Sequence, residues 1–357
     1  MAERPPVGFA GRPPAPQPGP SAAVAGGTPA APVLDDDAAA ALLPARPERG
    51  HKGDFGKLLV IAGSLDYAGA ALLVCRAAGR TGAGLVTLAV PESLQPLFAA
   101  KVVEATTMAL PEDDVEEVDP EPALGRILDH DHDAVVLGPG LKPGLATTEL
   151  ISALLAVPEE PVPSPAVVDA EALRSLASLD SWWDGVTRRV VLTPHVGEFR
   201  RLRAAGGADG EADGDLVADD TARVRAAVAA ADAWGQVVVL KGARTVVAAP
   251  GGAVAVAPFE NPALATGGTG DVLSGAIGSL LAQGLDPFAA ACLGVYLHGL
   301  AGEAVRGRLG DAGLLASDLP DELPIARRRL AALAARRAKG ARLGFGPRGP
   351  AAGEDVP

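Results

Sequence analysis

The sequence predicts an α/β fold, in which a central, mostly parallel and doubly wound sheet carries helices on both faces. Two observations predict it. Short, almost continuously apolar runs alternate along the chain with longer stretches whose apolar residues recur at helical spacing. Such runs are typical of strands buried on both faces of a parallel sheet. Their alternation with helices then indicates crossover connections between neighbouring strands.

The expected strands share this apolar character and lie at 57–63, 85–90, 134–138, 166–169, 190–193 and 237–240. Amphipathic helices are expected between them, for example at 69–82 and 146–157. Residues 246–256 differ, because Pro-Gly-Gly separates two short apolar runs and so predicts a hairpin. Three or four helical segments are expected after it, out to about residue 338.

The folded domain is expected to span residues 35–338. Residues 1–34 are rich in Pro, Ala and Gly, and both they and residues 339–357 lack the apolar clusters that would repay the entropy of ordering, which predicts two disordered tails. Residues 204–220, dominated by Gly, Ala and Asp, are expected to form an expanded surface loop.

Composition excludes several classes of function. The formal net charge of −13 argues against a nucleic-acid partner, because neutralising phosphates needs a basic surface. No signal peptide and no uninterrupted apolar run of membrane-spanning length is found, so we expect a cytoplasmic protein without a membrane partner. Cys75 and Cys292 lie in apolar stretches and are expected to be buried thiols.

Small, polar or charged residues follow the expected strands, at the edge of the sheet where ligands bind in such folds. They include the Gly-Pro-Gly turn at 138–140, Asp169, His195 and Lys241. Each of these residues could instead have a purely structural role. Residues 138–140 could form only a turn, Asp169 could cap a helix that begins near Glu171, and His195 could be an ordinary loop residue. His298 lies within a helical pattern and is expected to be a core histidine.

Lys241 ends a buried apolar run, where a lysine has little reason to lie unless its ammonium meets an anion. Gly242 would let the backbone approach that anion, and Thr245 would add a hydroxyl donor. This pattern favours a loop that binds a nucleotide's phosphate or ribose over a lysine that merely extends to the surface.

The stretch "NPALATGGTGDVLSG" (261–275) places glycines immediately before a helix expected from Val272. Their N–H groups and the positive end of the helix suit a phosphoryl group that gains charge during transfer. Asp271, with an ordinary aspartate pKa of about 4, would be ionised and would accept a hydroxyl proton. The stretch is neither a Walker loop nor a dinucleotide-binding GxGxxG, and together with Lys241 it indicates phosphoryl transfer. The expected phosphate nest comprises Gly267, Gly268, Thr269 and Gly270.

These motifs together have a specific resemblance. "HKGDFGKLLVIAGS", "YAGA", "GPGL", "TPHVGEFRRL", "LKGART" and "NPALATGGTGDVLSG" resemble the ADP-dependent NAD(P)H-hydrate dehydratases over about residues 40–335. The resemblance implies a ribokinase-like fold. It also implies a repair reaction, in which ADP drives dehydration of the 6S hydrate of NADH or NADPH, yielding AMP, phosphate and the restored dinucleotide.

The resemblance further implies roles for particular residues. Asp271 is the expected base, and Mg²⁺ is the expected bridge between the nucleotide phosphates, with ligands that the sequence does not identify. The positions that match the family's contacts with the hydrated dinucleotide are Ala70, Gly140, His195 and Asp271. Those that match its AMP-binding positions are Lys241, Gly242, Ala243, Arg244, Thr245 and Gly270.

The sequence departs from the family pattern at Val196, where Pro is frequent, and at Glu171, where Asp is frequent. The resemblance also implies a homotetramer. Because the segment before residue 40 is short, we expect the epimerase that is fused to many bacterial relatives to be a separate protein. A ribokinase-like small-molecule kinase and a non-catalytic nucleotide sensor remain the alternatives.

Overall fold

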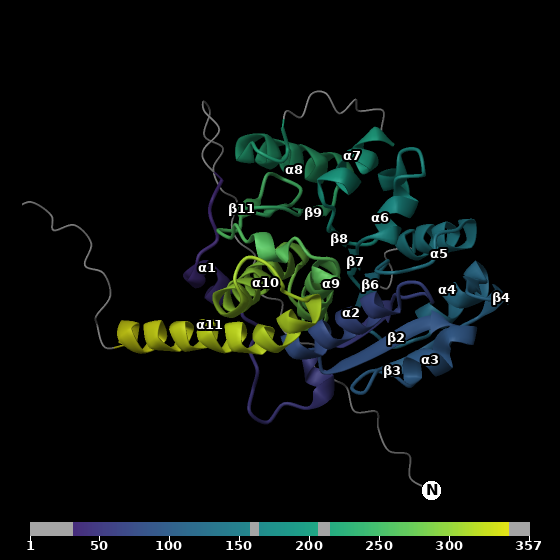
Figure 1. The fold of residues 1–357 in the computed structure, drawn as a ribbon, viewed down its shortest axis with the longest axis horizontal. Helices are drawn as coiled ribbons and strands as arrows, with labels where there is room; N and C mark the ends of the chain where they lie inside the picture. Colours follow the sequence, from purple (N-terminus) through teal and green to yellow (C-terminus); the bar gives the residue numbers. More distant parts are fainter. Residues whose placement is uncertain (1–30, 158–163, 206–214, 343–357) are drawn as a thin grey trace, which may run out of the picture. The chain divides into compact units, whose positions relative to one another are not determined.

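The computed structural model of the protein describes residues 31–157, 164–205 and 215–342. Within them a nine-stranded sheet has the order β11-β10-β9-β8-β7-β6-β1-β2-β3 (Figure 1). Its strands are β1 (Lys57–Ile61), β2 (Leu85–Pro91), β3 (Thr106–Leu110), β6 (Ala134–Leu137), β7 (Ala166–Val168), β8 (Val190–Leu192), β9 (Val237–Leu240), β10 (Val246–Ala248) and β11 (Val254–Val256). All pairs are parallel except β9–β10 and β10–β11. The predicted α/β class, strands and late hairpin are confirmed.

Side chains along each strand alternate between two hydrophobic cores, one on each face of the sheet. In β1, Leu58 and Val60 pack into one core while Leu59 and Ile61 pack into the other. The first core lies against α1 (Asp36–Ala41), α2 (Ala68–Thr81), α9 (Thr269–Ala282), α10 (Pro287–Leu309) and α11 (Leu319–Arg342). The second lies against α4 (Pro120–Leu128), α5 (Leu145–Leu155), α6 (Glu171–Leu176), α7 (Val196–Ala204) and α8 (Asp220–Trp234). The continuous apolar runs therefore reflect burial on both faces.

Glycines bring α9 unusually close to its neighbours. A Cβ on Gly275 would lie 2.4 Å from the Val74 carbonyl oxygen of α2, and one on Gly278 would lie 2.3 Å from a Val136 methyl of β6. Neither distance is sterically possible, so both positions require glycine. The result is that the start of α9, with its glycine-rich turn, is held directly over the centre of the sheet.

Some elements were not predicted. These are β3 and a small hairpin of β4 (Glu112–Asp114) and β5 (Glu117–Val118). β3 lies at one edge of the sheet and is only half buried, so it lacks a continuous apolar run. α3 (Gln95–Ala99) lies between β2 and β3.

The domain boundaries differ slightly from those expected. Residues 31–34 belong to the fold, since Val33 pairs with Val256 and the Leu34 N–H donates to the Val256 carbonyl at 2.8 Å. At the other end α11 continues to Arg342, beyond the expected limit of 338. In the expected 204–220 loop, Leu216 is fully buried and α8 begins at Asp220. The expected tails otherwise lie outside the described residues, as does the centre of that loop.

α10 is an unusually apolar helix. By length and composition alone it could cross a membrane, yet most of it is buried in the first core. A core helix passes the same test, so the composition of α10 is weak evidence for a membrane span. Both cysteines are free and buried, as expected.

Candidate active site

The carboxyl ends of β7, β8 and β9 bring three of the predicted residues together. Asp169 follows β7 directly, His195 is the third residue after β8, and Lys241 follows β9 directly. His195 and Lys241 form a parallel bridge, and the Lys241 N–H donates to the Pro194 carbonyl at 2.9 Å. The prediction that these strand ends meet at one edge is therefore confirmed.

The ammonium of Lys241 is paired within the protein. Its Nζ lies 2.8 Å from Asp169 Oδ1 and 3.9 Å from Glu198 Oε2. Burial lowers the pKa of this lysine, but the charges of Asp169 and Glu198 outweigh burial and raise its pKa overall. The lysine is therefore a fixed cation, and the anion that explains its position is first of all Asp169.

Asp169 does not cap α6. Ala170 occupies the cap position, where no side-chain hydrogen bond is made. The Asp169 carboxylate is instead buried, and its second oxygen accepts a 2.7 Å hydrogen bond from the Ser274 hydroxyl of α9. Burial raises the pKa of Asp169, but Lys241 and these hydrogen bonds prevail and lower it, so the group is an anion.

His195 does have a structural role, because it caps α7. Its Nδ1 accepts from the N–H groups of Gly197 at 3.0 Å and Glu198 at 3.3 Å, while Glu198 Oε2 accepts from the His195 N–H at 2.8 Å. This reciprocal arrangement fixes the imidazole tautomer, with the proton on Nε2 when the ring is neutral. The ring remains 56% exposed, so capping leaves the ring free to contact a ligand as well.

The glycine-rich turn leads into α9 earlier than predicted, at Thr269 rather than Val272. Gly268 has φ +90°, a left-handed conformation that only glycine adopts easily, and no side chain caps the helix. The Thr269 N–H donates to the Thr266 carbonyl at 3.4 Å, whereas the N–H groups of Gly270 and Asp271 precede the first intrahelical bond and remain available to an anion. The Thr269 hydroxyl, in contrast, is used internally, since it lies 2.9 Å from the Leu264 and Thr266 carbonyls.

Gly270 brings this turn next to the ion pair. A Cβ at Gly270 would lie 3.4 Å from Lys241 Nζ and 3.8 Å from an Asp169 oxygen. Gly270, whose N–H precedes the first intrahelical hydrogen bond, therefore lies next to the Lys241 ammonium, and this pairing of donors suits a phosphoryl group.

Asp271 is not the ordinary aspartate that the sequence suggested. Burial and the nearby charge of Asp169 raise its pKa to about 7, and Lys241 opposes them only in part. The expectation of a pKa near the ordinary value is thus wrong. A carboxylate with a pKa close to neutral is a better proton acceptor than an ordinary one, because general bases work best near the operating pH.

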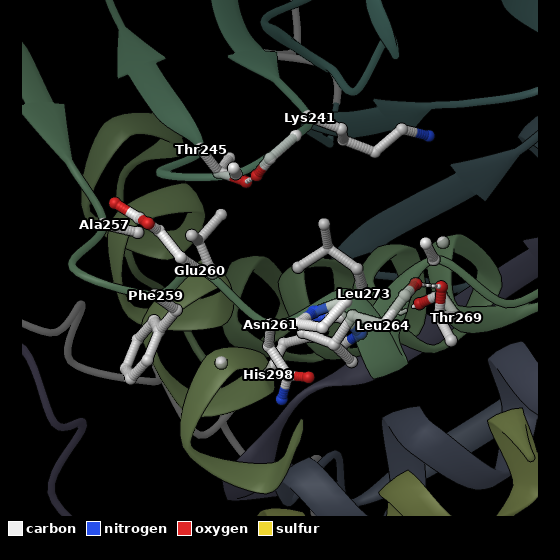
Figure 2. Close-up of a pocket in the computed structure, with 17 residues that line it drawn as sticks. Lys241, Thr245, Ala257, Phe259, Glu260, Asn261, Leu264, Thr269, Leu273 and His298 are labelled. Atoms are coloured by element: carbon white, nitrogen blue, oxygen red, sulfur yellow. Dashed lines mark hydrogen bonds between the residues drawn. The ribbon is translucent and has the colours of Figure 1, made fainter. Parts of the chain in front are cut away.

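A cavity of about 440 Å³ opens beside the turn (Figure 2). Lys241 and Thr245 lie on one side of it, with Phe259, Leu264 and His298 opposite. Its lining is mostly apolar, contributed by the loop after β9, residues 257–265 and the facing sides of α9 and α10. Size and polarity suit a purine base and its ribose.

The predicted AMP-binding loop contributes most of its residues to this cavity. Lys241, Gly242, Ala243, Thr245 and Gly270 line it. Arg244 is not among the lining residues, and its Nε lies 3.0 Å from Asp220 of α8. The Thr245 hydroxyl donates to the Gly242 carbonyl at 3.0 Å, so it shapes the loop as well as facing the cavity.

His298 is buried as predicted, but it also lines the cavity, which the sequence analysis missed. Its Nε2 lies 3.0 Å from the Thr269 carbonyl, an acceptor, so Nε2 carries the ring proton. Burial lowers the pKa of His298 to about 4, and the ring is neutral at physiological pH.

Ala70 and Gly140 lie against each other. Gly140 has φ +66°, and a Cβ there would lie 2.9 Å from Ala70 Cβ and 2.8 Å from the Tyr67 carbonyl oxygen. The Gly-Pro-Gly turn is itself anchored, because the Pro139 carbonyl accepts from the Gly63 N–H at 2.8 Å. Neither Ala70 nor Gly140 lines the apolar cavity, so these two predicted dinucleotide positions lie outside it.

The family model for NAD(P)H-hydrate dehydratase matches residues 58–325. The chain belongs to the NAD(P)H-hydrate dehydratase family. It is 38% identical to an ADP-dependent (S)-NAD(P)H-hydrate dehydratase of Neisseria meningitidis, with 77% of this chain and 86% of the relative covered.

Solved structures agree with the family's fold. The ADP/ATP-dependent NAD(P)H-hydrate dehydratase of Bacillus subtilis, co-crystallised with ATP and Mg²⁺, is 32% identical, with a TM-score of 0.69 and 85% of this chain and 100% of that one covered. A ribokinase-like superfamily protein from Enterococcus faecalis has a TM-score of 0.67 at 25% identity, covering 84% of this chain and 96% of its own. The predicted ribokinase-like fold is confirmed.

Other family members are longer. The bifunctional NAD(P)H-hydrate repair enzyme Nnr of Moorella thermoacetica is 42% identical over 81% of this chain, which spans only 52% of that enzyme. The chain thus spans about half the length of the bifunctional relatives it matches.

Proposed function

We propose that the protein dehydrates the 6S hydrate of NADH or NADPH, using ADP and releasing AMP, phosphate and the restored dinucleotide. The observation that carries the proposal is the position of Asp271. The aspartate lies in the first turn of α9, next to Gly270, which lines an apolar cavity of purine size, and near the fixed cation of Lys241. Membership of the dehydratase family supplies the substrate.

In the proposed reaction, the Asp271 carboxylate takes the proton of the hydrate's hydroxyl. The hydroxyl oxygen then attacks the β-phosphorus of ADP, and the bond from that phosphorus to the AMP oxygen breaks. Phosphate subsequently leaves the ring carbon while the neighbouring carbon loses a proton, which forms the ring double bond. Lys241 and the first N–H groups of α9 stabilise the charge on the transferred group, so the protein acts mainly by positioning and electrostatics.

The described residues do not provide a dedicated metal centre. No group of three or more His, Cys, Asp or Glu side chains suited to a metal was found among them. The buried carboxylate of Asp169, which adjoins the site, already accepts hydrogen bonds from Lys241 and Ser274. We therefore derive no step through Mg²⁺. If it takes part, the nucleotide's phosphate oxygens and water are the ligands that its chemistry favours.

The decisive experiment incubates the protein with purified 6S hydrate and ADP while the absorbance band of the reduced nicotinamide is followed. We expect the band to recover, with AMP and phosphate released in step. Recovery should depend on the nucleotide, and parallel reactions with ATP, and with NADH hydrate against NADPH hydrate, would define the preferences.

The same assay separates the alternatives. A ribokinase-like kinase would use ATP to phosphorylate a vitamin precursor or sugar and would restore no NADH. A nucleotide sensor would bind AMP without turnover. We also propose a cytoplasmic homotetramer that acts in sequence with an epimerase. Sedimentation of the purified protein tests the oligomeric state.

A further inference from the structure

One carboxylate joins the two elements that carry the proposed chemistry. Asp169 binds Lys241 of the β9 loop through one oxygen, at 2.8 Å, and Ser274 of α9 through the other, at 2.7 Å. Ser274 is fully buried, one helical turn after Asp271 and Gly270. The cation and the base are therefore tied to the same side chain, although they come from different parts of the chain.

The backbone around Asp169 is held in a costly conformation. Ala170 has φ +49° and ψ −118°, a region that residues with a Cβ rarely adopt. A Cβ on Gly138 would lie 2.0 Å from the Asp169 carbonyl oxygen, so position 138 in the neighbouring turn requires glycine. Strain of this kind persists where the surroundings fix it, and here it lies directly after Asp169, whose carboxylate reaches Ser274 of α9.

We propose that Asp169 is a positioning residue, which sets the separation of the Lys241 ammonium and the Asp271 carboxylate by holding the β9 loop and the start of α9 together. Asp169 touches neither the nucleotide nor the hydrate in this proposal. It acts through Lys241 and through Ser274. The inference rests on the proposed function for its kinetic consequences, but its structural part is independent of the substrate.

The charges around Asp271 support the same role for Asp169. Asp271 is faced by Asp169 from the end of β7, which raises the pKa of Asp271, and by Lys241 from the end of β9, which lowers it. Glu198 of α7 and neutral His298 of α10 adjoin Lys241 rather than the base. Loss of the Asp169 charge should therefore make Asp271 more acidic, whereas loss of the Lys241 charge should make it less acidic.

The test compares Asp169→Asn and Ser274→Ala with Ser279→Ala as the matched control. Ser279 is also a buried serine of α9, but its hydroxyl accepts from the Ala83 N–H at 2.9 Å, away from the site. In Asp169→Asn we expect kcat to fall by about 10- to 100-fold, because small misplacements of reacting groups are costly. The AMP dissociation constant, measured by calorimetry, should not weaken by more than about threefold, since the freed ammonium still meets phosphate.

The pH profile provides the readout that a purely structural role would not move. In Asp169→Asn the acidic limb of kcat/KM should shift to lower pH, whereas in Lys241→Ala it should shift to higher pH. Ser274→Ala should lower kcat by roughly 3- to 10-fold and leave the limb in place, because the Asp169 charge remains. Ser279→Ala should change neither kcat nor the limb.

Three results would overturn the inference. One is an Asp169→Asn enzyme that loses AMP affinity and kcat together with an unmoved pH limb. Another is that the effects of Asp169→Asn and Lys241→Ala on the activation free energy add up in the double variant, because the effects of residues that act through one another are not additive. If Asp169→Asn fails to fold, wild-type kcat in Ser274→Ala is the third. Absence of dehydration by the wild type would instead refute the proposed function, and the AMP titrations would still test the positioning role.

Discussion

The two parts of the site that we assign to the two ligands are built differently. The proposed nucleotide side is a cavity of about 440 Å³, with walls of buried helix and loop residues such as Leu273 and His298. The proposed hydrate side includes the close approach of Gly140 to Ala70 and to Tyr67, which is 60% exposed. In the proposed function one ligand therefore enters a preformed pocket, and the other lies on a surface shaped by backbone turns. Substitutions should then affect one ligand without the other, except at Asp271, the proposed base, which serves the reaction of both.

The largest expected effect removes that shared residue. Asp271→Asn should reduce turnover by at least about 10³-fold, because the amide cannot accept the hydroxyl proton. AMP affinity should stay within several-fold of wild type, since the cavity is unaltered. Single-turnover dehydration and calorimetry measure the two quantities. Retained turnover would remove Asp271 from the role of base.

A second substitution tests nucleotide binding. Lys241→Ala should weaken AMP and ADP binding by about 10- to 100-fold, because it removes a fixed cation and leaves Asp169 buried without its partner. Lys57→Ala, which breaks an ion pair with Asp131 far from the strand ends that bind ligands, is the matched control. Calorimetric titrations that show equal affinity for wild type and Lys241→Ala would contradict this prediction.

The hydrate side is tested with Gly140→Ala. The new methyl group meets Ala70 and the Tyr67 carbonyl, and φ +66° disfavours alanine, so the turn must move. We expect KM for the hydrate to rise by about 10-fold with AMP affinity unchanged. The control is Gly125→Ala, at a helix position where nothing lies within 4 Å of the added methyl group. It should change neither the KM for the hydrate nor the AMP affinity. An equal loss of AMP affinity would show that the two sides are not separate.

The smallest effect concerns stability. Because the pKa of Asp271 rises from 3.8 to about 7 on folding, the unfolded chain ionises this group at lower pH than the folded protein does. Its contribution therefore lowers the free energy of unfolding as pH increases from about 4 to about 7, and is constant above that range. Asp271→Asn should raise stability at pH 8 by on the order of 1–2 kcal/mol and leave it unchanged at pH 4. Urea unfolding at both pH values measures this, and equal differences at the two pH values would contradict it.

Much of the fold was predictable because burial on both faces leaves a continuous apolar run in each central strand. The edge strand β3, with Thr106 exposed and Met108 buried, carries no such run and was missed. The turn before α9 was predictable for a similar reason, since glycines that serve the backbone are visible in the sequence. Its first helical residue was not, because a Thr-Gly-Asp start lacks a capping side chain.

The electrostatics of the site could not be predicted in the same way. Asp169 and Ser274 are 105 positions apart, and only the fold shows that their side chains meet. The pKa of Asp271 depends on this buried anion and on desolvation, neither of which is a property of the local sequence. His298 could have been suspected from its place after Tyr296 in an apolar helix, but its access to the cavity depends on the packing of α10 against residues 257–265.

The pairing of Val33 with Val256 also has a consequence for handling the protein. β11 ends the sheet, and residues 32–34 occupy part of its outer side through hydrogen bonds to the Val256 N–H and carbonyl. A truncation at residue 35, where the sequence alone would place the start of the domain, uncovers an unpaired valine-rich edge. Exposed edges of this kind recruit other strands, so we expect the few residues before the first helix to protect the protein from edge-to-edge aggregation.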